Sequence, residues 1–345
     1  MKINILFGGA SYEHEISIVS AITLKEKLTK FSLSYIFCDT DHTLYLIDAS
    51  KMKAKTFSSG EYKKLPKLTI ESGAFVQKAL FGSTRLDGVV LNLVHGGDGE
   101  DGTIASLLEF FHVPFIGPRV DASVLSFDKH YTKLLCDAVG VKALEYEVLT
   151  SNDKRELKTP LPFIVKPSRL GSSIGISIVK EQSELEYALD VAFEFDKSVI
   201  VEPFVAGVRE FNLAGFKAGG ELVFSNIEEV SKEEFLDFEK KYMDFSDSQK
   251  RTKADLSEAL EVKMREAFRL VYGDLFDGSL IRCDFFVIDN EIYLNEINPI
   301  PGSMANYLFD DFEGELARLA SSLPSKKRIT TQYSYIHSIS QAKGK

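Results

Sequence analysis

The sequence predicts a protein of several domains, with an open α/β domain first and α+β segments after it. Two apolar segments, 2–7 (KINILF) and 86–94 (LDGVVLNLV), each run into a glycine-rich loop, as buried parallel strands do. Two segments with helical spacing of apolar residues, 17–28 and 103–111, alternate with them. The length of 345 residues also exceeds that of one ordinary domain.

The following elements extend this pattern along the chain. Strands at 34–38 and 113–116 complete the first domain, which we expect to end near Gly117-Pro118. A helix and a small α+β unit should follow, with a strand hairpin around a Gly/Ser loop. The segments are 126–139, 162–167, 174–179, 183–193 and 198–202.

The last third should contain a strand, an amphipathic helix and a second hairpin, at 210–216, 256–272, 280–287 and 291–297. Residues 231–256 are polar and irregular, and a long irregular segment inside a compact domain is often functional. The tail after Thr330 is polar and weakly patterned. We therefore expect three parts, with the boundaries 1–117, 118–201 and 202–345.

The composition is that of a soluble chain, with 44% hydrophobic and 27% charged residues. The net charge of −10 argues against nucleic acid or an anionic membrane as the main partner. No segment approaches the roughly 20 apolar residues of a membrane span, and the N-terminus lacks a signal-peptide pattern. Cys38, Cys136 and Cys283 form neither a CxxC pair nor a zinc spacing, so we expect a reducing, cytoplasmic location.

The second hairpin carries the sharpest chemical signal. Residues two apart in a strand share a face, so Asp284, Glu296 and Asn298 should gather on one surface if Asp289-Asn290 forms the turn. Carboxylate and amide oxygens suit Mg²⁺ held between protein and phosphates, and Arg282 could neutralise a transferred phosphoryl group or an oxyanion. The alternative is a solvated hairpin face, but the strands are otherwise apolar.

The first hairpin carries a second signal, in the loop SRLGSS after Lys166. Ser172 and Ser173 could present backbone N–H groups to phosphate oxygens, although many hairpins carry such residues. The chain contains no Walker A sequence. Lys166, at the end of an apolar strand, points outward or pairs with an anion, whereas Lys129 by itself is typical of a surface helix.

Two glycine-rich loops follow strands of the first domain, where α/β folds place ligands. The loop HGGDGEDG runs from His95 to Gly102, and the alternative is an acidic turn that caps the next helix. In the loop GGASYEHEIS, Glu15 could favour the helix dipole or bind a substrate ammonium group. Neither loop contains GxGxxG, so a dinucleotide fingerprint is absent.

Taken together, these motifs resemble the D-alanine–D-alanine ligase family of the ATP-grasp superfamily. The similarity runs in order along nearly the whole chain. It comprises FGGxSxEHEIS from Phe7, HGGDGEDG from His95, FIGPxxxASxLSxDKxxTK from Phe115 to Lys133, VKPSRLGSSIG from Val165, and RCDFFV…YLNEINPIPG ending at Gly302.

The resemblance implies a three-part ATP-grasp fold, with ATP between the central and C-terminal domains. It implies that Glu15 and His95 bind the first D-alanine, that Arg282 stabilises the tetrahedral intermediate, and that the Gly302 N–H binds the second carboxylate. It also implies catalytic roles for Ser172 and Tyr242 and two Mg²⁺, which Mn²⁺ could replace, on Asp284, Glu296 and Asn298. The implied nucleotide contacts are Lys129, Lys166, Ser172, Ser173, Glu202, Pro203, Phe204, Val205, Glu210 and Lys241.

Three positions depart from the family pattern. Leu170 stands where the family often has a glutamate, and Ala105 stands where it often has a glutamine. Tyr307 stands where a serine commonly helps to hold the carboxylate of the second substrate. The departure at Tyr307 bears on the identity of the second substrate.

The implied reaction is ATP-dependent joining of two D-alanines through an acyl phosphate, for peptidoglycan precursors in the cytoplasm. A homodimer is expected from the same resemblance. Three alternatives stay open: a related ligase that uses D-lactate or D-serine as acceptor, a non-catalytic module that senses ATP, and a dehydrogenase, which lacks its glycine fingerprint.

Overall fold

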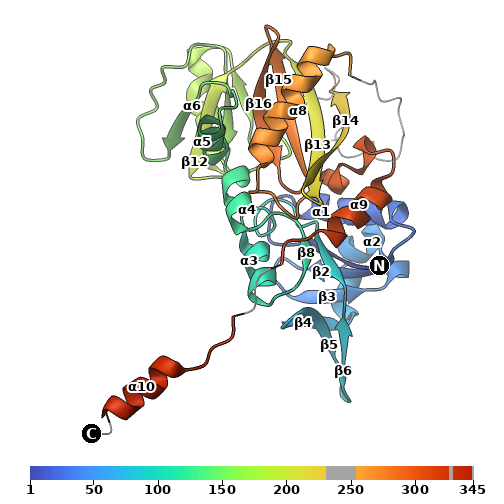
Figure 1. Cartoon of the computed structure of the whole chain (residues 1–345). Coiled ribbons are helices and arrows are strands. Elements are labelled where there is room, and N and C mark those ends of the chain that lie inside the picture. The colour runs from blue at the N-terminus through green and yellow to red at the C-terminus, as the bar shows by residue number, and fades with distance from the viewer. Residues whose placement is uncertain (231–253, 326–328, 344–345) are drawn as a thin grey trace.

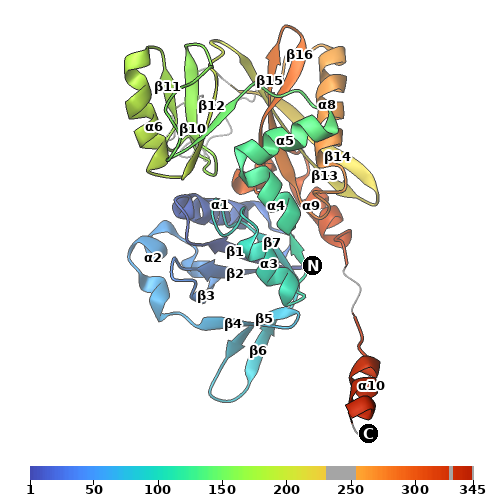
Figure 2. The same ribbon diagram turned by 90° about the vertical axis from the view of Figure 1, so that its left-hand side faces the viewer.

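The structure is a computed structural model that describes residues 1–230, 254–325 and 329–343. Three sheets organise this part of the chain. Figures 1 and 2 show the first sheet below and the other two side by side above it. The mixed α/β multidomain class expected from the sequence is confirmed.

The first sheet has eight strands in the order β6-β5-β4-β3-β2-β1-β7-β8. Its parallel pairs are β2–β1, β1–β7 and β7–β8, as expected, while β3 to β6 form an antiparallel meander that the sequence analysis did not predict. The elements are β1 (Lys2–Gly8), α1 (His14–Lys27), β2 (Ser32–Cys38), β3 (Leu44–Ile47), η1 (Ala49–Lys51), α2 (Ala54–Ser58), η2 (Glu61–Lys64), β4 (Lys67–Glu71), β5 (Ala74–Lys78), β6 (Ser83–Leu86), β7 (Val89–Asn92), α3 (Thr103–Phe110) and β8 (Phe115–Ile116).

The expected strand 86–94 is confirmed over 89–92 and wrong at its start, because the chain turns at Asp87-Gly88. β6 ends at Leu86 on one edge of the sheet, and β7 begins at Val89 beside β1. Gly88 has a φ of 125°, and a Cβ there would lie 2.6 Å from the Lys2 carbonyl oxygen. Glycine is therefore required at this break.

The second sheet has the order β11-β10-β12-β9. The expected hairpin is confirmed, since β10 and β11 are antiparallel. The expected helix 126–139 is wrong at its start: α4 ends at Phe127, Asp128 is extended, and α5 begins at Lys129, with the Asp128 side chain accepting a hydrogen bond from the His130 N–H at 3.0 Å. The elements are α4 (Val120–Phe127), α5 (Lys129–Val139), β9 (Glu147–Thr150), β10 (Phe163–Pro167), β11 (Ser177–Val179), η3 (Gln182–Glu184), α6 (Leu185–Phe193) and β12 (Ser198–Pro203).

The third sheet has the order β14-β13-β15-β16. The expected second hairpin is confirmed, and Asp289 and Asn290 form its turn with φ of 50° and 62°. The register places Arg282 opposite Asn298 and Asp284 opposite Glu296. The elements are β13 (Arg209–Ala218), β14 (Glu221–Glu229), α8 (Glu258–Tyr272), β15 (Ile281–Ile288), β16 (Glu291–Asn298), η5 (Gly302–Leu308), α9 (Phe312–Ser321) and α10 (Ser334–Lys343).

A left-handed turn follows β16 at the start of η5. Ser303, Met304 and Ala305 have φ of 47°, 54° and 46°, and all three side chains are buried. Each such non-glycine residue costs about 1–2 kcal/mol of backbone strain. The surrounding packing must therefore hold this turn in place.

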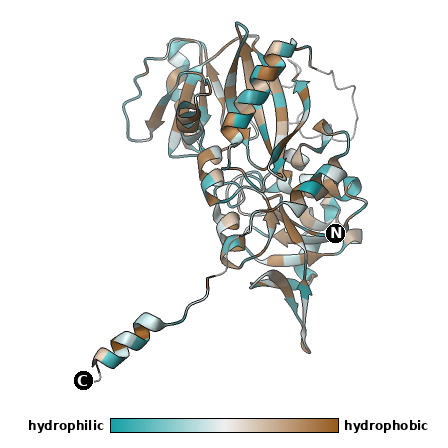
Figure 3. Ribbon diagram, viewed as in Figure 1, coloured by the Kyte–Doolittle hydropathy of each residue, from teal (hydrophilic) through white to brown (hydrophobic). Residues whose placement is uncertain are grey.

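The first and third sheets share one hydrophobic core. This cluster joins Phe7 and Leu91 of the first sheet to Phe216 of β13 and to Met304 and Leu316 beyond β16. By contrast, β9 to β12 and α6 enclose a cluster of their own. In Figure 3 the strands are mostly brown, the colour of hydrophobic residues, while the helices mix brown with the teal of hydrophilic residues.

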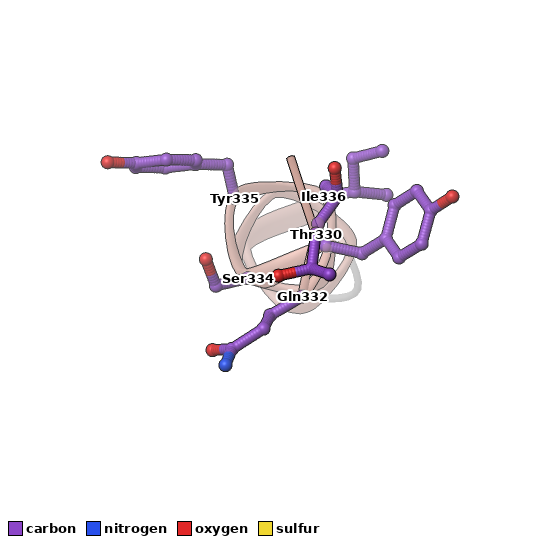
Figure 4. A pocket seen from close by; sticks show the side chains of 7 residues that line it. Thr330, Gln332, Ser334, Tyr335 and Ile336 are labelled. Atoms are coloured by element: carbon purple, nitrogen blue, oxygen red, sulfur yellow. The ribbon is translucent and has the colours of Figure 1, made fainter. Parts of the chain in front are cut away.

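The tail helix α10 lies apart from the body of the molecule (Figures 1 and 2). A shallow hollow at its start is lined by residues 330–336 (Figure 4), none of which is a candidate site residue. Of the helices in the described ranges, none has the length and apolarity of a membrane span.

The left-handed turn generates a stability prediction. Ala305→Gly should change the free energy of unfolding by about 0.5 kcal/mol or less, because relief of backbone strain offsets the lost methyl contact. Ala21→Gly, at an equally buried position inside the right-handed helix α1, should cost about 2 kcal/mol. Urea unfolding of both variants measures the difference, and equal losses would contradict the strain.

Candidate active site

Polar side chains from all three sheets meet at one place. Lys166 of β10 lies 3.5 Å from the Asn295 side-chain oxygen of β16, and Lys129 of α5 lies 3.0 Å from Glu296. The Ser172 hydroxyl, after β10, donates to Glu13 of the first domain. The structure thus brings together Lys129, Lys166, Ser172 and Glu296, four of the residues selected from the sequence.

Glu202 lies between two lysines in the interior. Its carboxylate pairs with Lys166 at 2.6 Å and also with Lys133 of α5, and the Glu202 and Lys133 side chains are 2% and 3% exposed. Burial alone would raise the pKa of Glu202, but the two ammonium charges and their hydrogen bonds outweigh it and lower the pKa to about 2. Glu202 is therefore ionised and keeps both lysines in place.

Lys129 links the loop after β10 to β16. Its Nζ donates to the Leu170 carbonyl oxygen at 2.6 Å and pairs with Glu296, and its backbone N–H donates to Ser168 at 2.9 Å. Burial alone would lower the pKa of Lys129. The negative charge and hydrogen bond of Glu296, together with the charges of Glu13 and Glu202, outweigh burial and raise the pKa of Lys129. The Asp128 cap at the start of α5 sets this position, so Lys129 is not a surface residue.

Arg282 and Asp284 form a buried bidentate pair on β15, with N–O distances of 2.7 and 2.9 Å. The Asn298 amide donates to the same carboxylate at 3.0 Å. Glu296 lies opposite Asp284 in the sheet register. In the described residues no group of three or more His, Cys, Asp or Glu could hold a metal, but two carboxylates beside an amide oxygen form a donor set that fits Mg²⁺.

Glu13, rather than Glu15, belongs to this cluster. Glu15 is exposed on α1, whereas Glu13, one residue before the helix, is buried against Ser172. A Cβ on Gly96 or Gly171 would lie 2.8 or 2.9 Å from the Glu13 carboxylate, so both glycines let the backbone approach it. Glu13 Oε2 has no hydrogen-bond partner among the described residues, which fits a cationic ligand.

His95 and Glu100 lie beside Glu13, with the His95 Nδ1 3.8 Å from Glu100. Burial lowers the pKa of His95 to about 4, so its ring is neutral at pH 7. Burial and the Glu296 charge raise the pKa of Glu100 to about 8, so Glu100 is largely protonated at that pH. Burial and then Glu100 also raise the pKa of Glu13.

The other selected residues lie around this centre. Ser173 follows Ser172 in the loop, with φ of 58° and 57° respectively. Gly302 begins η5, next to the left-handed turn. Lys241 and Tyr242 lie outside the described residues. The expected hinge and ribose residues are at the end of β12 and the start of β13; they are Pro203, Phe204, Val205 and Glu210.

The three departures from the family pattern have different surroundings. Leu170 is buried and offers its carbonyl oxygen to Lys129, a contact that its side chain does not affect. The Tyr307 hydroxyl lies 3.5 Å from Arg282. Ala105 is fully buried in the core beneath α3.

Four polar residues described above were missed in the sequence: Glu13, Glu100, Lys133 and Asn295. A signal existed for Lys133, because residues four apart on a helix share a face, and Lys133 is four residues after Lys129. Glu13 could have been separated from Glu15 only by knowing where α1 begins.

Comparisons with known proteins agree with this architecture. The family models described as "D-ala D-ala ligase N-terminus" and "D-ala D-ala ligase C-terminus" match residues 2–118 and 135–311. A D-alanine–D-alanine ligase of Sulfurimonas denitrificans is 67% identical over 345 residues, which is 100% of both chains.

Solved structures also resemble this chain. The D-alanine–D-alanine ligase of Helicobacter pylori is 50% identical with a TM-score of 0.85, covering 95% of this chain and 100% of that one. The VanG D-Ala:D-Ser ligase of Enterococcus faecalis is 26% identical with a TM-score of 0.74, covering 93% and 97%.

The fold and the cation-lined site between its sheets define an ATP-grasp ligase. The sequence identity to relatives along the whole length narrows the assignment from this class of ligase to one family. The chain belongs to the D-alanine–D-alanine ligase family.

The buried position of Glu202 generates a pH prediction. Glu202→Gln should cost about 3–5 kcal/mol at pH 7, because it leaves two buried lysines without their counter-charge. The folded pKa of Glu202 is about 2, below its ordinary value, so its stabilisation is complete above about pH 4.5 and falls as the pH drops toward 2. The variant should therefore lose less stability than the wild type between about pH 5 and 3, as measured by urea unfolding.

Glu291 provides the matched control, since it also pairs with two lysines, Lys142 at 3.1 Å and Lys263 at 2.9 Å, but on the surface. Glu291→Gln should have a much smaller effect than Glu202→Gln. Similar losses in the two variants would show that burial does not set the contribution of Glu202.

Proposed function

We propose that this site joins two D-alanines with the energy of ATP. The carboxylate of the first D-alanine attacks the γ-phosphorus, which gives an acyl phosphate and ADP. The amine of the second D-alanine attacks the acyl carbon, and phosphate leaves with formation of D-alanyl-D-alanine. The observation that carries the proposal is the meeting of Glu13, Lys129, Lys166 and Arg282 at one site in a chain of this family.

The first D-alanine is proposed to bind through its ammonium group at Glu13. A substrate cation would favour the ionised form of this carboxyl, whose pKa burial raises. The neighbouring His95 and Glu100 are largely uncharged at pH 7, so neither competes for the ammonium. This assignment takes the role expected for Glu15, which is exposed.

The phosphates of ATP are proposed to contact Lys129 and Lys166, with Ser172 and Ser173 in the adjoining loop. Residues 202–205 and Glu210 would hold the adenosine. Asp284, Glu296 and Asn298 would hold two Mg²⁺, or Mn²⁺, which supply charge neutralisation at the γ-phosphoryl group. Lys129 and Arg282 already lie against two of these proposed ligands.

Arg282 is proposed to stabilise the tetrahedral intermediate. The Gly302 N–H is proposed to bind the carboxylate of the second D-alanine. The buried Asp284 carboxylate holds the guanidinium through two hydrogen bonds, which limits the rotamers available to Arg282. The expected catalytic role of Tyr242 and the nucleotide contact of Lys241 stay predictions, because both residues lie outside the described ranges.

D-Alanine is the favoured second substrate. The relatives named D-alanine–D-alanine ligase are 52–67% identical to this chain, whereas the neighbour named a D-Ala:D-Ser ligase is 26% identical. Membership of a ligase family also argues against the dehydrogenase and ATP-sensing alternatives.

The same proposal includes the cellular setting. We place the reaction in the cytoplasm, in the synthesis of peptidoglycan precursors, and expect a homodimer. The domain boundaries 1–117, 118–201 and 202–345 also stay predictions. The first boundary agrees with the end of the first sheet at Ile116, whereas the second falls within β12 (Ser198–Pro203), and the third sheet begins at Arg209.

The direct test is phosphate release from Mg·ATP with D-alanine, compared with L-alanine and with no amino acid. We expect release only with D-alanine, and one D-alanyl-D-alanine per phosphate by mass spectrometry. Release that requires D-serine or a hydroxy acid would move the assignment to a related ligase. Binding of ATP without release under any condition would exclude a ligase.

Two glutamates near the start of α1 allow a paired test of the ammonium site. Glu13→Gln should raise the KM for D-alanine about 10- to 100-fold, because one charged hydrogen bond is lost, and leave ADP affinity unchanged. Glu15→Gln should leave the KM for D-alanine and the affinity for ADP within about two-fold of the wild type, as expected for an exposed side chain. The opposite pattern would restore Glu15 as the ammonium ligand.

A further inference from the structure

Ser20 is a buried serine of α1 that joins two parts of the site. Its side chain is 1% exposed. Its Oγ accepts a hydrogen bond from the Ser303 backbone N–H at 3.1 Å and lies 3.0 Å from His95 Nε2. One hydroxyl of the first domain therefore contacts both the His95 loop and the left-handed turn after Gly302.

The proton of this hydroxyl can be placed from its partners. Ser303 donates its N–H to Ser20 Oγ, so the hydroxyl proton is free for an acceptor. In the part of the chain that the structure describes, His95 Nε2 is the other hydrogen-bond partner of Ser20 Oγ. The His95 ring also has a backbone hydrogen bond to Ile300, whose carbonyl oxygen accepts a ring proton. A neutral ring that donates through Nδ1 leaves Nε2 to accept the Ser20 hydroxyl proton, and this is the arrangement tested below.

The turn held by Ser20 needs such support. Ser303, Met304 and Ala305 are all left-handed without being glycine, and a backbone in this conformation persists only when its surroundings hold it. The Ser303 N–H is buried, so loss of its acceptor would leave the donor unsatisfied at the residue next to Gly302.

We propose that Ser20 is a positioning residue for the ligation: it holds His95 with the ring proton on Nδ1 and fixes the turn after Gly302 beside the first-substrate pocket. The inference rests on the proposed function, because it assigns His95 and Gly302 to the two D-alanine subsites. Ser20 itself acts through His95 and Ser303 and has no assigned contact with substrate.

Ser17 is a matched control on the same helix. It is also fully buried, accepts a backbone N–H from Gly8 at 2.8 Å and donates to the Leu93 carbonyl oxygen at 2.6 Å. Ser17→Ala thus removes a hydroxyl with the same number of hydrogen bonds, and its partners lie at the end of β1 and just after β7, not in the left-handed turn.

The kinetic test compares Ser20→Ala with Ser17→Ala in the full chain. Ser20→Ala should raise the KM for D-alanine about 10-fold, the loss of roughly one buried hydrogen bond, and leave the KM for ATP within about two-fold. Both variants should lower the thermal midpoint of unfolding to a similar degree. Ser17→Ala, however, should not raise the KM for D-alanine relative to the KM for ATP. An unchanged KM for D-alanine in Ser20→Ala, equal effects on both substrates, or the same split in Ser17→Ala would overturn the proposal.

A spectroscopic test separates this proposal from the activity. In ¹⁵N-histidine spectra, with the His95 signals assigned by His95→Gln, the wild type should show a protonated Nδ1 and a hydrogen-bonded, unprotonated Nε2. Ser20→Ala should shift the Nε2 signal, and Ser17→Ala should not. A wild-type protein without ligase activity but with this signature would reject the function and keep the contact. A ring protonated on Nε2 would overturn the proposed role of Ser20 in holding the proton on Nδ1, because Nε2–H would then donate to the Ser20 oxygen.

Discussion

The site depends on one constraint: charges buried between the sheets must be paired. Three carboxylates, Glu202, Asp284 and Glu296, face the cations Lys129, Lys133, Lys166 and Arg282. An unpaired buried charge is unfavourable by several kcal/mol, so each carboxylate fixes the position of its partner. The protein can therefore hold four cations close together, because its own carboxylates balance most of their charge.

The folding pattern serves the same constraint. A short antiparallel hairpin places Arg282, Asp284, Glu296 and Asn298 together, because cross-strand neighbours are set by register. Asp128 ends one helix and caps the next, which places Lys129 at the first position of α5, where its backbone and side chain both contact the loop after β10. Local backbone signals thus decide which side chains reach the interior.

Much of this could be predicted from the sequence, and the failures have physical causes. The hairpin of β15 and β16 was predictable because strand alternation and the Asp289-Asn290 turn agree. Glu13 was not, since only the position where α1 begins shows that Glu13 is buried just before the helix and that Glu15 is exposed on its first turn. The meander β3 to β6 was missed because its strands have four or five residues, too few for a clear alternation.

The separate core of the second sheet bears on how ligands enter. Its apolar cluster is formed within β9 to β12 and α6. The contacts of this unit with Glu13 and Asn295 are polar, and Phe195, which follows α6, packs edge-to-face against Tyr12 of the first domain at 5.2 Å between ring centroids. A change in the angle between this unit and the rest would therefore break polar contacts together with the Tyr12–Phe195 contact. Since the heat-capacity change of a transition follows the apolar surface that it exposes, such an opening would have a smaller calorimetric signature than exposure of the cluster itself, and its electrostatic contacts would make its equilibrium depend on ionic strength.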